Sequence, residues 1–291
     1  MPLSIKNPYR NDVSSWLKGN LHAHTTNSDG RRSPQEVVDE YAKSGYAFLM
    51  ISDHDFLTDP SGVDARGMVL IPGSEITAEG PHVLHVNAES TVAPNADRQI
   101  VIDEINADGA FAVVAHPNWE KNFAHCPQEK LEAWQGYIGI EVYNGVIRRL
   151  DGSPLATDRW DRLLGLGRRV WGFAHDDSHR SGDDGIAWIM VQAENRSLAG
   201  ILEALRNGAF YASTGVTIET IRVSGKTIEV QTRDADRLIA YSDFGHRELT
   251  VDGPRLAFTV SENSTIKYVR VECWGRGECM AWTQPFYIEG V

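Results

Sequence analysis

The sequence predicts an α/β fold that is followed by a small antiparallel β domain. Between residues 19 and 213, short apolar runs alternate with segments that have helical patterns. Several runs, such as FAVVA at 111–115, are continuously apolar, which is typical of parallel strands buried on both faces of a sheet. After residue 213 the segments become β-rich and are separated by short polar turns. We therefore expect two domains, residues 1–213 and residues 214–291.

The strand candidates of the first domain are short and apolar, and helical segments separate most of them. They lie at residues 48–52, 68–72, 82–86, 111–115, 138–142, 169–174 and 187–193. This alternation indicates parallel βα units, and about seven strands favour a β/α barrel over an open sheet.

The helix after residue 33 is the best defined of four predicted helices. Residues 33–36 (SPQE) form a capping box with proline in the first turn, and Gly45 is placed to end the helix. The other three helices are expected at about 97–107, 155–165 and 197–207.

Charge and composition argue against several classes of protein. The 291 residues include 28 basic and 40 acidic side chains, so the formal net charge is −12. Long nucleic acids and anionic membranes need a basic binding face, so we expect neither as a partner. Cysteines at 126, 273 and 279 are too few and too scattered for a disulfide framework. We also expect no secretory leader and no membrane span, and therefore a cytoplasmic location.

Nine of the ten histidines precede residue 180, so the chemistry is expected in the first domain. His22 and His24 are two residues apart, so in a strand their side chains would point to the same side. There they could bind one metal ion together. Asp29 follows in a turn that can bring its carboxylate over the same point. An isolated pair of this kind is common and weak, so the prediction depends on the other motifs.

Other predicted strands also end in histidine or in a carboxylate. These residues are His54 in SDHD, Glu75 in PGSE, His116 in AHP, and Asp177 and His179 in DDSH. His82 and His85 share one strand but face opposite sides, so only one of them should reach a common site. Imidazole and carboxylate together suit Zn, Mn or Fe ions, and the joint pattern predicts a metal site.

The motifs HAHTTNSDG, SDHD, PGSE, HVN, AHP and DDSH, in this order, resemble the PHP superfamily, which is named for polymerase and histidinol phosphatase. The resemblance covers about residues 19–213. The HVNA segment and the trailing β region are similar to the metallohydrolase branch that includes carbaryl-hydrolysing enzymes. The resemblance implies a distorted seven-stranded β/α barrel with a bowl-shaped site for two to three divalent ions.

The resemblance also implies which residues bind these ions. The implied ligands are His22, His24, Asp29, His54, Glu75, His85, His116, Asp177 and His179. Glu75 would bridge a first ion, held with His22, His24 and Asp177, and a second ion, held with His85 and His116. The remaining three residues would hold a third ion. His85 is preferred to His82 because of the HVN match.

The function implied is metal-dependent hydrolysis of a small phosphomonoester or a short nucleotide. A hydroxide shared by two ions would attack phosphorus, with Glu75, His85, His116 and Arg180 as the catalytic residues. Arg31, Arg148 and Arg149 lie near predicted loops and are candidate phosphate donors, although each could simply be a surface residue. Asp53, Asp55 and Asp176 are candidates to orient imidazoles, and Glu141 is expected either to do the same or to face the substrate. The same hydroxide could instead attack a carbamate, ester or amide, and a non-enzymatic PHP-like module is the third alternative.

Overall fold

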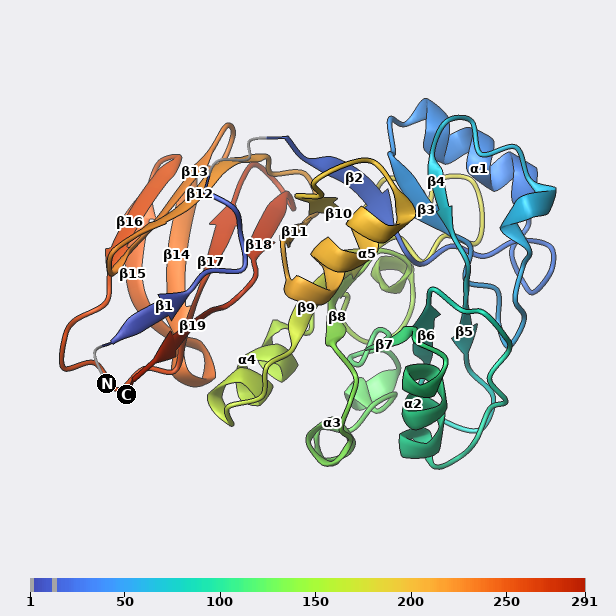
Figure 1. Ribbon diagram of the computed structural model, residues 1–291, viewed down its shortest axis with the longest axis horizontal. Coiled ribbons are helices and arrows are strands. Elements are labelled where there is room, and N and C mark those ends of the chain that lie inside the picture. Colours follow the sequence, from blue (N-terminus) through green and yellow to red (C-terminus); the bar gives the residue numbers. More distant parts are fainter. Residues whose placement is uncertain (1–2, 12–14, 291) are drawn as a thin grey trace.

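The computed structural model describes residues 3–11 and 15–290, which form a mixed α/β fold with a β-rich part at one end (Figure 1). The largest sheet runs through both parts. Its strand order is β1 (Ser4–Lys6), β19 (Phe286–Glu289), β17 (Tyr268–Trp274), β18 (Met280–Thr283), β11 (Phe210–Ser213), β10 (Trp188–Val191), β2 (Leu17–Asn20), β3 (Phe48–Met50) and β4 (Val69–Ile71). In addition, β14 (Arg237–Ser242) pairs with β17, and β15 (His246–Asp252) pairs with β14.

Two smaller sheets complete the described strands. The second sheet has the order β5 (Gly73–Ile76), β6 (Val83–Val86), β7 (Phe111–Val114), β8 (Gly139–Asn144) and β9 (Trp171–His175). The third sheet has the order β12 (Ile218–Ser224), β13 (Thr227–Thr232) and β16 (Arg255–Thr259).

The α/β prediction is confirmed, but a closed seven-stranded barrel is not. The strands β2, β3 and β4 pair in parallel in the first sheet, whereas β5 to β9 form the second sheet. Among the described residues, isolated bridges join Ala23 to Ser178 and His54 to Glu75 between the two groups. Strand β6 is antiparallel to both neighbours. For β5 and β6 this follows from the short connection, because residues 77–82 are too few for the crossover that parallel pairing would need.

The four predicted helices are confirmed to within two residues at each end. They are α1 (Pro34–Lys43), α2 (Arg98–Ala107), α4 (Thr157–Gly165) and α5 (Leu198–Asn207). Ser33 and Glu36 form the capping box at the start of α1. The six-residue α3 (Gln128–Ala133) was not predicted, since it is too short to show a helical period. Short 3₁₀ helices lie at η1 (Pro60–Gly62), η2 (Lys121–Phe123), η3 (Val146–Arg149) and η4 (Asp243–Gly245).

A buried ion pair connects the β-rich part to the α/β part. The guanidinium of Arg270, on β17, donates to both carboxylate oxygens of Asp161, on α4, at 2.7 and 2.5 Å. Arg270 also donates to Glu272 at 2.9 Å, so its charge is fully paired. Apolar groups such as Trp160 pack beside this pair, and the Tyr268 hydroxyl donates to Asp161 at 3.0 Å. No helix in the described ranges is both long and apolar enough to cross a membrane.

Candidate metal centre

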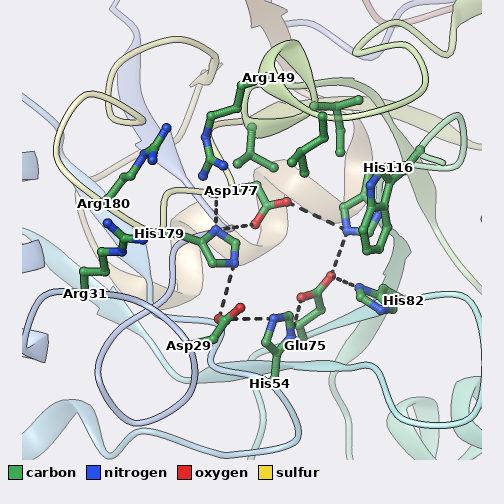
Figure 2. Close-up of a pocket in the computed structure, with 14 residues that line it drawn as sticks. Asp29, Arg31, His54, Glu75, His82, His116, Arg149, Asp177, His179 and Arg180 are labelled. Carbon is green, nitrogen blue, oxygen red and sulfur yellow. Dashed lines mark hydrogen bonds and ion pairs between the residues drawn. The ribbon is translucent and has the colours of Figure 1, made fainter.

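The histidines and carboxylates gather where several strands end. His22 and His24 follow β2, His54 follows β3, and His116 follows β7. Asp177 and His179 follow β9, while Glu75 lies inside β5. Because the carboxyl ends of parallel strands meet at one edge, residues distant in sequence lie close together there. Figure 2 shows Glu75 and Asp177 between the imidazoles of this cluster.

The first group consists of His22, His24, Glu75 and Asp177, all of them buried. Oδ1 of Asp177 lies 3.1 Å from Nε2 of His22 and 3.0 Å from Nε2 of His24. The Glu75 oxygens lie 3.4 and 3.5 Å from the same two nitrogens. Four side chains able to bind a metal ion therefore converge on one position.

Glu75 also belongs to a second group, with His116 and His82. Its Oε1 atom lies 3.1 Å from Nε2 of His116 and 3.1 Å from Nδ1 of His82. The same carboxylate thus contacts imidazoles of both groups, as a bridging ligand would.

The third group lies nearer to solvent and contains Asp29, His54 and His179. Oδ1 of Asp29 is 3.3 Å from Nε2 of His54 and 3.3 Å from Nε2 of His179. Nδ1 of His54 lies 3.0 Å from Oε2 of Glu75, which connects this group to the other two.

These groups fit divalent cations on two independent grounds. First, Nε2 of His22, Nε2 of His24, Oε2 of Glu75 and Oδ1 of Asp177 are buried without a hydrogen-bond partner, which is costly unless another ligand satisfies them. Second, two ligands about 2.1 Å from one ion in tetrahedral geometry lie about 3.4 Å apart. The separations in the first group, 3.0 to 3.5 Å, are close to that spacing.

The cluster is electrostatically coupled. Burial would raise the pKa values of Glu75 and Asp177, but the surrounding imidazoles, above all His22, hold both well below their usual range. Burial would lower the pKa of His54, but its contacts with Asp29 and Glu75 raise it to about 10. In the metal-free protein, protons on the imidazoles thus supply positive charge that bound cations would replace.

Two of the clustered residues have positive φ angles, which residues other than glycine rarely adopt. The φ angle is 24° at His116 and 54° at Asp177. Such residues persist only where their surroundings hold them, and they are typical of functional sites. The backbone N–H of His116 donates to Glu141 at 2.8 Å, and that of Asp177 donates to the His22 carbonyl at 3.0 Å.

The prediction for His85 is wrong. Glu75 lies opposite Leu84 in the β5–β6 pair, and His85 lies opposite Ser74. Since opposite residues share a face and neighbours alternate, the side chain of His85 is on the other face of the sheet from Glu75. Its Nε2 atom lies 3.6 Å from Asp108 instead. His82 occupies the place expected for His85.

Of the carboxylates considered for orienting imidazoles, the described contacts support Glu141 in that role. Glu141 lies 2.8 Å from ring nitrogens of His22 and His175. The predictions for Asp53, Asp55 and Asp176 are wrong, because their hydrogen-bond donors are hydroxyl, amide and backbone groups rather than imidazoles. Asp53, for example, holds the turn that carries Asp29 by accepting from Thr25 and Ser28.

A cavity of about 290 Å³ opens above the cluster. It is lined by Asp29, Arg31, His54, Glu75, His82, His116, Trp119, Val146, Ile147, Arg149, Leu150, Asp177, His179 and Arg180. The three arginines lie on the His179 side in Figure 2, away from His82 and His116. Arg148 does not line this cavity and pairs with Glu278 at 2.7 Å, so its predicted contact with phosphate is wrong.

Sequence reasoning did not identify several residues near the cavity, among them Trp119 and His125. Trp119 lines it, and His125 accepts a hydrogen bond from the backbone N–H of His82 at 3.0 Å. Both follow β7 in an irregular segment, where no periodicity indicates which way a side chain points. His82 was considered, but the register that selects it is visible only in the folded sheet.

Comparison with known structures identifies the class of fold. A two-domain protein from Bacteroides vulgatus, which contains a predicted PHP-like metal-dependent phosphoesterase, superposes with a TM-score of 0.54 and 21% sequence identity. The match covers 92% of this chain and 93% of that chain. The chain therefore has a PHP-like fold, as its motifs predicted.

Sequence comparison adds two short matches. No family model matches the chain. A 5′-3′ exoribonuclease of Haemophilus influenzae is 35% identical over 82 residues, or 25% of this chain and 30% of that protein. A 3′,5′-nucleoside bisphosphate phosphatase of Chromobacterium violaceum is 35% identical over 71 residues, or 23% of this chain and 25% of that protein. The matched segments thus span less than a third of these relatives.

Proposed function

We propose that this protein is a metal-dependent phosphoesterase that hydrolyses a small phosphomonoester or a short nucleotide. The observation that carries the proposal is the convergence of three His/carboxylate groups on Glu75, beneath a cavity with three arginines. The two relatives support it, because their names describe enzymes that act on ribonucleic acid and on a nucleoside bisphosphate.

The residues that would hold the ions follow from the three groups. They are His22, His24, Glu75 and Asp177 for the first ion, Glu75, His82 and His116 for the second, and Asp29, His54 and His179 for the third. When bound, such ions activate water as a nucleophile near neutral pH and neutralise charge on a phosphoryl group.

The arginines supply the remaining positive charge. Their planar, forked N–H groups match phosphate oxygens and orient the ester over the cluster. Arg149 is held in place by Asp183, to which it donates at 3.1 and 2.8 Å. Arg180 is half-exposed and lies 3.7 Å from Asp183, so its guanidinium is less constrained than that of Arg149 and can contact a substrate.

Part of the cavity wall is apolar. Trp119, Ile147 and Leu150 line it, and Leu150 remains 42% exposed. This wall excludes water from the reacting group and offers packing for the carbon part of the substrate, which favours an ester with an aromatic or apolar portion. A nucleotide has this composition of anionic and aromatic parts.

We also propose that residues 1–213 form the catalytic unit and residues 214–291 a supporting β domain. All residues of the cavity precede residue 184. The Arg270–Asp161 pair would then hold the second domain against α4, behind the strands of the site.

Activity assays with defined metal content test the function. The purified chain is loaded separately with Zn, Mn and Fe, its metal content is measured, and it is offered p-nitrophenyl phosphate, nucleoside 3′,5′-bisphosphates, short oligonucleotides and aryl carbamates. We expect turnover of phosphate esters that is lost on His24→Ala and kept on His246→Ala, a histidine of the β-rich part. Faster turnover of carbamates, or no turnover by metal-loaded protein, would overturn the proposal.

A further inference from the structure

The carboxylate of Glu141 contacts three histidines although it does not line the cavity. Glu141 lies on β8 and is 1% exposed. Its Oε1 atom is 2.8 Å from Nδ1 of His22 and 2.8 Å from Nδ1 of His175. Its Oε2 atom accepts from the backbone N–H of His116 and from Nδ2 of Asn144, both at 2.8 Å. Four donors thus surround one buried carboxylate.

These contacts are hydrogen bonds rather than the spacing of a metal site. Ligands of one tetrahedral ion lie about 3.4 Å apart, whereas Glu141 and its two imidazole partners are separated by 2.8 Å. Nδ1 of His22 therefore carries a proton and donates it to Glu141. When a metal ion displaces the second proton of His22, Nδ1 keeps its proton and the Nε2 atom, 3.1 Å from Asp177, presents its lone pair to the ion.

Glu141 reaches two further members of the cluster through the backbone and through an amide. Its bond to the N–H of His116 holds a residue whose φ angle is 24°. Asn144 donates to Glu141 and also to Oδ2 of Asp177, at 3.2 Å. The carboxylate is therefore connected to residues that follow β2, β7 and β9.

We propose that Glu141 is a positioning residue that holds His22 in the Nδ1–H tautomer and fixes His116 and, through Asn144, Asp177. This proposal depends on the metal centre proposed above. Glu141 would thus raise the metal affinity of the site without touching the substrate. Carboxylates that orient metal-binding histidines typically contribute 10- to 100-fold to metal affinity.

Replacement by glutamine is a sharp test because it changes one acceptor oxygen into a donor. The backbone N–H of His116 cannot reverse its role, so the amide oxygen of Gln should face His116 and Asn144. The amide NH₂ would then face Nδ1 of His22 and of His175, which could only accept. Both rings would have to carry their proton on Nε2, and in His22 this proton blocks the lone pair that a metal ion needs.

The experiment compares Glu141→Gln with Glu272→Gln, which neutralises another buried carboxylate, on β17, that does not line the cavity. Zinc affinity is measured by competition with a chelator, and Nδ1–H resonances of ¹⁵N-labelled histidines are recorded with and without zinc. We expect Nδ1–H signals for His22 and His175 in the unchanged protein. Glu141→Gln should lose them and bind zinc about 10- to 100-fold more weakly, whereas Glu272→Gln should retain both properties.

Other outcomes separate the two proposals. If Nδ1 of His22 carries no proton in the zinc-loaded unchanged protein, or if Glu141→Gln binds zinc normally, the role of Glu141 is overturned. The resonances of the unchanged protein decide this even if the variant fails to fold. If the signals and the zinc affinities behave as expected but no phosphate ester is hydrolysed, the phosphoesterase proposal fails and the positioning role stands.

Discussion

Nδ1 of His82 lies 3.1 Å from Oε1 of Glu75, while His85, three residues further on, faces Asp108 on the other side of the sheet. We therefore expect His82→Ala to lose one bound ion and to lower kcat roughly 100-fold or more, because a metal ion contributes several kcal/mol to charge stabilisation. Elemental analysis and kinetics of the purified variant provide the measurement.

The matched control is His85→Leu, which keeps a side chain of similar size in a fully buried position. Its metal content and kcat should equal those of the unchanged protein. Loss of the ion in this variant, with retention in His82→Ala, would show that the HVN pattern identifies the ligand better than the geometry does.

The two histidines illustrate what the sequence can and cannot predict. His22 and His24 are identified by local alternation, and α1 by its capping box, because both signals lie within a few residues. The choice between His82 and His85 depends on which residue of β5 lies opposite Leu84, and that register comes from pairing of two strands. The pairing of β1 with β19 joins the two ends of the chain and was likewise beyond any local pattern.

Arg98 is expected to stabilise the loop that carries His82. It is fully buried, and its guanidinium donates to the carbonyls of Pro81 at 2.6 Å, Ala78 at 2.8 Å and Gly80 at 3.0 Å. Arg98→Met would leave several buried carbonyls without donors, each costing about 1–3 kcal/mol. We expect the free energy of unfolding to fall by about 3 kcal/mol or more.

Urea denaturation of metal-free protein measures this loss. Arg66→Met is the control, because Arg66 is exposed and pairs only with surface carboxylates in the described residues. Its effect should stay within about 1 kcal/mol. Equal losses in both variants would contradict the role assigned to Arg98.

The pair Arg270–Asp161 should be a major contact between α4 and the β-rich part. Both side chains are buried, and Asp161→Asn removes the charge that Arg270 meets at two atoms. Arg270 keeps Glu272 as a charged partner, so weakening its charge-assisted hydrogen bonds to Asp161 should cost about 1.5–3 kcal/mol. Chemical denaturation should show this loss, whereas Arg237→Ala, which breaks the exposed pair with Asp252, should cost about 1 kcal/mol or less.

Metal binding should become tighter as the pH rises from neutrality. In the metal-free protein the pKa of His54 is raised to about 10, so its imidazole carries a proton that a cation must displace. The stability of the metal-free fold changes with pH in the opposite direction. The raised pKa stabilises the metal-free fold fully below about pH 6.5, and this contribution is lost as the pH rises through about 10.

Calorimetric titration with zinc in buffers of different ionisation enthalpy measures the number of protons released. We expect His54→Asn to release about one proton fewer at neutral pH. The His246→Asn variant should release as many protons as the unchanged protein. Proton release that is the same in all three proteins would contradict the charged state assigned to His54.

Arg180 and Arg148 offer a matched test of phosphate recognition, since both lie near the site but only Arg180 lines the cavity above the cluster. Loss of a hydrogen bond from a charged donor costs about 1.5–3 kcal/mol, so Arg180→Ala should lower kcat/KM for a phosphate ester roughly 10- to 100-fold. Arg148→Ala should change it little, because that guanidinium is engaged with Glu278. Lower kcat/KM in Arg148→Ala alone would show that the substrate approaches through the neighbouring groove, which both arginines line.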